Sequence, residues 1–372
     1  MKRLFTQIQT QLVQLGTQNP QGNALKRINN LSGFVAGMIR KGSSHLTNIG
    51  SGLPKNINAH SKTIAAKRFV ENKWTDFDVH FLPYLLSFLR AILAFTPLRT
   101  GVVLVIDGSQ MGKDNAALMI SLVWRNRGIP ICWFVKKGSK GHFKAEDHEE
   151  VLKCAIKILS SLLAKSMPVT LLGDGEFDGI GLQQLCLREG WNYVLRTACD
   201  SIFYENGERF EAKAVSPCQD HNCVFIGNVE FTKARFKYVS FVCWHDRKRH
   251  DEAIYLVSNL ICSGDIIGFY DQRYSIECLF KDLKSTSFNL HKTRLKKPEQ
   301  VSNLIIIAAL AFILLTSLAI QYDQTIWRKR VQRVRRDRNV LSFFTFAYRL
   351  IDHFIDYEID FTFSFQFSKN FD

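Results

Sequence analysis

The chain has 372 residues, a hydrophobic fraction of 46% and a formal net charge of +15, with an isoelectric point near 9.4. This composition excludes a mainly disordered chain, and the length allows two or three domains around a hydrophobic core. The charge favours a polyanionic partner, either nucleic acid or an anionic membrane surface. Residues 1–70 hold ten Lys and Arg but no Asp or Glu, and residues 328–338 hold seven basic residues and one acid. We therefore expect binding surfaces in these two segments.

The cysteines and the first residues bear on the cellular compartment. Nine cysteines are scattered along the chain, mostly inside apolar runs, which suits reduced thiols in a cytoplasmic protein. The chain begins MKRLFTQIQTQLVQL, where Gln and Thr interrupt the apolar run, so it does not read as a secretory signal. We expect a cytoplasmic protein.

Residues 1–95 are predicted to form a helical, basic region. The segment 61–74 has the pattern of a helix capped by Ser61, and its exposed basic residues are Lys62, Lys67 and Arg68. An apolar helix is expected over 78–95, broken or started near Pro83.

Residues 96–199 alternate between buried strands and helices in the order β-β-β-α-β-α-β. The strands are expected at 101–109, 115–125, 128–137, 168–174 and 191–197, and the helices at 145–165 and 179–190. Residues 200–266 consist of short alternating pieces, which predict a β-rich unit of its own.

Residues 270–284 read YDQRYSIECLFKDLK and predict an α-helix with two faces. At about 100° per residue, Tyr270, Arg273, Glu277 and Lys284 fall within a stripe of about 60°. An adjacent apolar stripe would face the core; its members are Ile276, Leu279, Phe280 and Leu283. The alternative is an ordinary amphipathic helix whose charged face is simply solvated.

Residues 302–322 carry no charge and are long enough to span a bilayer. Both flanks are basic, so the asymmetry of a membrane topology is missing. We favour a helix buried in the core of region 267–325 and keep a membrane span as the alternative. Residues 326–372 form a basic and aromatic C-terminal segment.

Two predicted strands end in an acid, at Asp107 and Asp174, where functional groups gather in an open α/β sheet. Either acid could instead only start a turn. If Glu277 lay beside them, the three carboxylates would repel one another unless Mg²⁺ or Mn²⁺ were bound. Two such ions activate a water or a 3′-hydroxyl at a phosphodiester, and Arg273 and Lys284 could then hold DNA phosphates.

The strand VLVIDGS, the strand LLGDGEFDG and the spacing Y-x2-R-x3-E-x6-K resemble the DDE transposases of bacterial insertion sequences, in particular the insertion-sequence-four family. The similarity covers residues 100–350 well. It implies an RNase H-like catalytic core interrupted by a β-rich insertion, and a helical N-terminal region that binds the element's ends. It also implies a homodimer in a synaptic complex.

The resemblance also implies roles for individual residues. Asp107, Asp174 and Glu277 would bind two Mg²⁺ or Mn²⁺ ions and be catalytic, with Glu176 and Asp178 as alternatives for the second acid. The implied DNA contacts are Tyr270, Arg273, Lys284 and Trp244. Residues 1–95 match the family only in general style, and there we expect the exposed Lys62, Lys67 and Arg68 to contact DNA. Trp244 could stack on a displaced base, although local packing is the other interpretation.

The resulting hypothesis is a DNA transposase that binds terminal inverted repeats and performs metal-dependent cleavage and strand transfer. Its partner would be double-stranded DNA, and it would not bind a membrane. It would lie in the cytoplasm and associate with the nucleoid when bound to DNA. The alternatives are an RNase H-like nuclease without strand transfer and an inactive, DNA-binding transposase derivative.

Overall fold

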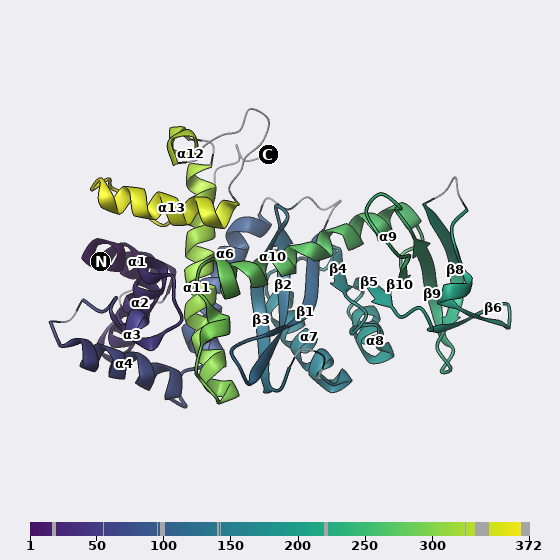
Figure 1. Ribbon diagram of the computed structural model, residues 1–372, viewed down its shortest axis with the longest axis horizontal. Coiled ribbons are helices and arrows are strands. Elements are labelled where there is room, and N and C mark those ends of the chain that lie inside the picture. Colours follow the sequence, from purple (N-terminus) through teal and green to yellow (C-terminus); the bar gives the residue numbers. More distant parts are fainter. Residues whose placement is uncertain are drawn as a thin grey trace.

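The computed structural model shows an elongated molecule (Figure 1). Its N-terminal helices lie at one end, and the last strands of its sheet lie at the other. The structure describes residues 1–16, 20–54, 56–94, 96, 101–139, 141, 143–218, 222–323, 325–331 and 342–365.

The N-terminal region is helical, as predicted. Its helices are α1 (Lys2–Leu15), α2 (Gly22–Lys41), α3 (Leu46–Gly50), α4 (Ala59–Glu71), α5 (Phe77–His80) and α6 (Leu82–Leu93). The interruption expected near Pro83 is confirmed, because Pro83 lies in the first turn of α6. The expected Ser61 cap is wrong. The Asn58 side chain caps α4 and accepts a hydrogen bond from the Ser61 amide at 2.8 Å, so Ser61 already lies inside the helix.

The strands of the described residues form one sheet in the order β3-β2-β1-β4-β5-β10-β9-β8-β6-β7. Their bounds are β1 (Val102–Gln110), β2 (Asn115–Trp124), β3 (Arg127–Lys137), β4 (Val169–Gly173), β5 (Asn192–Thr197), β6 (Ile202–Glu205), β7 (Glu208–Glu211), β8 (Cys223–Phe231), β9 (Phe236–Trp244) and β10 (Ile254–Ser258).

The first half of the sheet has the predicted element order. The helix α7 (Ala145–Ser160) connects β3 to β4, and α8 (Ile180–Arg188) connects β4 to β5. The strands β1, β2 and β3 pair antiparallel, whereas β4 pairs parallel with both β1 and β5. All of β4 and nearly all of β1 are buried, as expected for parallel strands covered on both faces.

The β-rich insertion does not form a sheet of its own, which differs from the expectation. Its strand β10 pairs antiparallel with β5 and with β9, so the insertion extends the sheet of the core. The physical reason lies in β5, which would otherwise end the core sheet with unpaired backbone groups; β10 satisfies them.

The apolar segment near the C-terminus is helix α11 (Pro298–Tyr322). By length and composition this helix could cross a membrane, but its most apolar window is 100% buried inside the protein. It contacts α2, α4, α13 and β3 and stands between the N-terminal helices and the sheet (Figure 1). The prediction of a buried core helix is confirmed.

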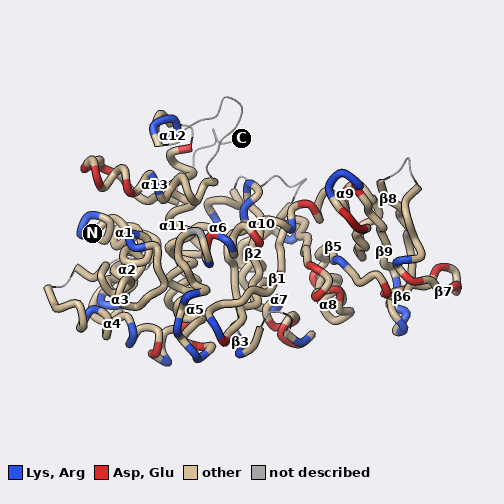
Figure 2. The backbone as a smooth tube through the Cα atoms, in the orientation of Figure 1, with Lys and Arg blue, Asp and Glu red and all other residues tan. Residues whose placement is uncertain are grey.

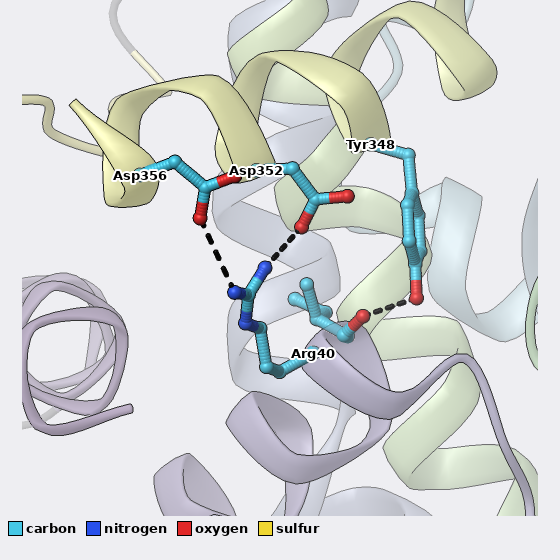
Figure 3. Close-up of polar contacts among 5 residues, drawn as sticks. Arg40, Tyr348, Asp352 and Asp356 are labelled. Atoms are coloured by element: carbon cyan, nitrogen blue, oxygen red, sulfur yellow. Dashed lines mark hydrogen bonds and ion pairs between the residues drawn. The ribbon is translucent and has the colours of Figure 1, made fainter.

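The described part of the C-terminal segment contains α12 (Ile326–Val331) and α13 (Phe343–Asp356). Most of the basic run 328–338 lies outside the described residues, which resume at 342. The helix α13 is attached to α2 by polar contacts that Figure 3 shows. Arg40 pairs with Asp352 and, at 3.4 Å, with Asp356, and the Tyr348 hydroxyl donates to the carbonyl of Ile39.

Candidate active site

Asp107 and Asp174 lie at corresponding positions of adjacent parallel strands. The register of β1 and β4 ends with Ile106 opposite Gly173, and each acid is the next residue. Asp107 is only 2% exposed, and its carboxylate accepts a hydrogen bond from the Gly108 amide at 2.7 Å. The parallel pairing therefore brings together two acids that are far apart in sequence.

The segment that carries Glu277 is helical but is not one regular α-helix. It consists of α9 (Ser263–Tyr270), a 3₁₀ turn η2 (Asp271–Arg273), α10 (Tyr274–Lys281) and a π-helical turn η3 (Asp282–Thr286). The predicted apolar stripe is confirmed, because each of its four side chains is buried. It packs against β1, β2 and β3 and so holds α10 against the sheet.

Arg273 connects the other charged groups of this segment. Its Nη2 donates to Glu277 Oε1 at 2.6 Å, and its guanidinium lies 5.7 Å from the centre of the Tyr270 ring. Burial lowers the pKa of Arg273, but the charges of Tyr270, Asp174 and Glu277 outweigh burial and raise it overall. Burial raises the pKa of the Tyr270 hydroxyl. The charge of Asp174 therefore affects the pKa values of Tyr270 and Arg273 in the helical segment.

A pocket of about 760 Å³ opens between β1 and α10, and both Asp107 and Glu277 line it. Lys284 also lines the pocket, and its Nζ donates to Ser109 Oγ on β1 at 3.1 Å. Two carboxylates and two lysines, Lys281 and Lys284, give the pocket both metal-ligand chemistry and cations for a phosphate.

Residues 146–314 match the family model of a transposase DDE domain. The match supports a DDE transposase, which implies DNA as the partner and polynucleotidyl transfer as the reaction class. The matched range includes Asp174 and Glu277 and begins after Asp107.

Two further comparisons add little to the DDE domain match. No curated protein matches the sequence. Among solved structures, an Argonaute from Aquifex aeolicus is 11% identical over 55% of this chain, with a TM-score of 0.25. The match spans only 28% of the Argonaute chain and is too distant to carry an argument.

DDE transposases generally use divalent metal ions, and the acids of this site are suitable donors in one respect. Carboxylate oxygens are the hard ligands that Mg²⁺ and Mn²⁺ prefer. Within the described residues, however, no three His, Cys, Asp or Glu side chains are close enough to hold a metal ion. Glu277 is instead neutralised by Arg273. The donor chemistry therefore fits, while the three carboxylates remain apart.

The two alternatives for the second acid of the DDE domain have other partners. Glu176 Oε1 lies 3.9 Å from His148 Nε2 on α7. Asp178 accepts a hydrogen bond from the Thr197 hydroxyl at 2.6 Å, and burial raises its pKa. Asp174 lies 3.7 Å from Arg196, measured from Oδ1 to Nη1, and its charge also acts on Tyr270 and Arg273, which favours it as the second acid.

The remaining predicted DNA contacts lie away from this pocket. Trp244, at the end of β9, is 5% exposed and packs edge-to-face on His250, so its ring has no open face for a base. Lys67 and Arg68 are exposed on α4, and the Nζ atom of Lys67 lies 3.9 Å from Oε1 of Glu71. Lys62 is half-buried and donates to the carbonyl of Leu53 at 2.8 Å.

Sequence reasoning missed several residues of the pocket, among them Ser109, Lys281 and His291. Ser109 follows Asp107 by two positions on the same strand, so strand periodicity could have placed it on the same face. His291 contacts the carbonyl of Lys284 through its Nδ1 because the chain folds back after α10. No local pattern predicts that return.

Proposed function

We propose that this protein is a DNA transposase of the insertion-sequence-four kind, which binds terminal inverted repeats and performs cleavage and strand transfer. One observation carries the proposal. Asp107 and Glu277 line one pocket although they come from distant segments, and Asp174 directly follows β4, the strand that pairs with β1. The strand order β3-β2-β1-β4-β5, with β1 parallel to β4, supports an RNase H-like core.

In this proposal Asp107, Asp174 and Glu277 hold two Mg²⁺ or Mn²⁺ ions, which when bound activate a water or 3′-hydroxyl at a phosphodiester. The side chains of Arg273 and Lys284 bind the DNA phosphates and keep the scissile strand in the pocket. The ion pair between Arg273 and Glu277 supports a second role for Arg273. It neutralises Glu277 in free protein, and a phosphate competes for the same guanidinium.

The N-terminal helices contribute the contacts to the element's ends, including Lys62, Lys67 and Arg68. Two copies of the chain pair two ends as a homodimer, in the cytoplasm at the nucleoid. A base that stacks on Trp244 requires that residue to leave its contact with His250, because the ring is buried.

The test is a cleavage assay on the DNA that flanks the coding sequence, with Mg²⁺ or Mn²⁺. We expect wild-type protein to cut at a fixed end and to join that end to a second DNA. Glu277→Gln should reduce cutting by at least about a hundredfold, because a charged group of the site is lost. Asp265→Asn changes an exposed acid of α9 and should cut normally.

Each other result has a definite meaning. Nicks without joined products indicate a nuclease, and retarded but uncut DNA with the wild type indicates an inactive DNA-binding derivative. Normal cutting by Glu277→Gln would show that the third acid is wrongly assigned. Asp174→Asn and Glu176→Gln, compared in the same assay, decide which acid is the second.

A further inference from the structure

A second pocket, of about 450 Å³, lies in the N-terminal region between α2, α4 and the turn at residues 72–75. Most of the described side chains that line it are basic, amide-bearing or aromatic, the others are Ala65 and Thr75, and none is a carboxylate. This composition suits a ligand that carries both negative charge and a flat ring. The volume lies in the range of small-molecule sites and is large enough for a nucleotide.

The turn at 72–75 presents Trp74 in a fixed position. The Trp74 amide donates to Asn72 Oδ1 at 3.1 Å, and the Thr75 amide donates to the Asn72 carbonyl at 3.0 Å. The Thr75 hydroxyl also donates to the carbonyl of Phe69 in the last turn of α4, at 2.8 Å. The backbone is therefore held on both sides of Trp74, yet its side chain belongs to a residue that is 72% exposed. A large aromatic ring exposed to water on such a fixed backbone is a ready stacking surface.

Three cations lie in or beside this pocket. Arg27 on α2 and Arg68 on α4 line the pocket and are exposed, and neither forms an ion pair with a carboxylate in the described part of the chain. The Lys73 ammonium lies 5.1 Å from the centre of the Trp74 ring. Figure 2 shows further Lys and Arg along the N-terminal helices. Two guanidinium groups without an acid partner are well suited to bind phosphate.

The floor of the pocket is apolar. Phe34 and Phe69 pack with ring centres 5.2 Å apart, and His80 meets Phe69 edge-to-face. Burial lowers the pKa of His80, which keeps its imidazole neutral near pH 7. The arginines thus attract the negative charge of a ligand, and the aromatic side chains attract its flat ring.

We propose that this pocket binds one unpaired nucleotide of a DNA strand, with its base stacked on Trp74 and the flanking phosphates on Arg27 and Arg68. DNA as the polymer rests on the proposed function; the pocket itself is separate from the candidate active site, because α11 stands between the N-terminal helices and the sheet (Figure 1).

An unpaired nucleotide fits better than an intact duplex. In a duplex both faces of each base are covered by neighbouring base pairs, so a ring can stack only on a terminal or extruded base. Extrusion costs a few kcal/mol, and stacking on an aromatic side chain recovers about 1–3 kcal/mol per base. We therefore expect the pocket to favour DNA in which a base is already displaced.

The experiment compares three labelled duplexes of one sequence by fluorescence anisotropy with the full-length protein. One duplex is fully paired, one carries a single extrahelical adenine, and one carries an abasic residue at that position. We expect wild type to bind the adenine duplex about tenfold more tightly than the other two, which corresponds to stacking of one base.

Variants then assign the preference to the pocket. Trp74→Ala should bring the ratio of the two dissociation constants close to one, whereas Trp74→Phe should retain most of it, because a ring remains. Arg27→Gln should reduce the salt dependence of binding by about one phosphate contact. Tyr238→Ala removes another exposed aromatic ring, 80% exposed on the insertion, and should keep the wild-type ratio.

Two results would overturn the proposal: no preference for the adenine duplex in wild type, or a preference that persists in Trp74→Ala. Equal binding of the adenine and abasic duplexes would also reject it, because the pocket would then recognise phosphate alone. Its failure is distinct from that of the proposed function. Protein that cuts and joins DNA without the preference rejects only the pocket, and protein with the preference that never cuts rejects only the transposase.

Discussion

At the scale of single residues, Arg273 and Asp282 show how the segment around α10 handles buried charge. Arg273 donates to Glu277, and Arg196 Nη1 lies 3.7 Å from Asp174 Oδ1, so each of these carboxylates has a nearby cation. Asp282 is buried without a cation at hydrogen-bond distance among the described residues. It is 5% exposed, and the Nη1 atom of Arg127 lies 4.0 Å from its Oδ2. A buried acid without a close partner destabilises the folded protein when it ionises.

The pKa of Asp282 provides a test at this scale. Burial raises it from 3.8 to about 6, against the opposing effect of Arg127 and Lys281. The folded state therefore holds a proton that the unfolded state releases between about pH 4 and 6, and stability falls as the pH rises through that window. Above pH 6 the full cost remains, at most about 3 kcal/mol.

We predict that Asp282→Asn raises the midpoint of thermal unfolding relative to wild type above pH 6, and that the difference shrinks toward pH 4. Unfolding followed by circular dichroism from pH 4 to pH 7 measures this difference. Asp251→Asn, at an exposed acid, should show no such pH dependence. A difference between Asp282→Asn and wild type that is constant with pH would contradict the assignment.

At the scale of elements, close approach of backbones decides how the N-terminal helices pack. The helices α2 and α3 contact each other at Gly37, where an added Cβ would lie 2.1 Å from the carbonyl oxygen of Ile49. Gly52 approaches α2 in the same way, with its Cβ position 1.9 Å from the carbonyl oxygen of Gly33. These glycines are needed because there is no room for a side chain, although glycine weakens a helix.

Gly37→Ala should therefore destabilise the protein by about 1–3 kcal/mol, despite the higher helix propensity of alanine. Gly268 in α9 is the matched control, because nothing lies within 4 Å of its Cβ position. Gly268→Ala should stabilise by about 0.5–1 kcal/mol. Urea unfolding of both variants measures the change in the free energy of unfolding, which should have opposite signs. A stabilised Gly37→Ala would refute the packing argument.

At the scale of the whole molecule, α11 and α13 join the N-terminal helices to the rest of the protein. The helix α11 is buried along nearly its whole length and contacts elements from both halves of the chain. The helix α13 adds the polar contacts of Figure 3 to the end of α2. The Ile39 carbonyl is among the last four of α2, which lack partners within the helix, and the Tyr348 hydroxyl satisfies it.

The two polar contacts of α13 should differ in strength. Asp352 and Asp356 are 46% and 60% exposed, so their pairing with Arg40 is screened by water and should contribute less than about 1 kcal/mol. The Tyr348 hydroxyl is largely buried, as the upward shift of its pKa on burial indicates. Tyr348→Phe should therefore cost about 1 kcal/mol or more. Thermal unfolding of Tyr348→Phe and Arg40→Gln tests this order, and a larger loss for Arg40→Gln would reverse it.

Much of the fold could be predicted because its signals are local. Apolar runs of strand length predicted β1 to β5, and the 3.6-residue period predicted the buried face of α10. The Ser61 cap failed because Asn58, three residues earlier, is an equally good cap in sequence. Of the proposed site, Asp174 was visible as a strand end and Glu277 from helix spacing, whereas β1 continues past Asp107 to Gln110 and only its pairing with β4 stops there.

The amino-acid sequence by itself determined where strands and helices form, that α11 is apolar enough for a core, and that basic charge gathers in the first 70 residues. Tertiary structure alone decided that Asp107 and Glu277 line one pocket, that β10 continues the core sheet, and that Trp244 is buried while Trp74 is exposed. The physical reason is the distance along the chain over which each interaction acts. The spacing of hydrophobic residues and the conformational preferences of turn residues act over a few residues. Pairing, burial and charge compensation depend on neighbours that are distant in the chain.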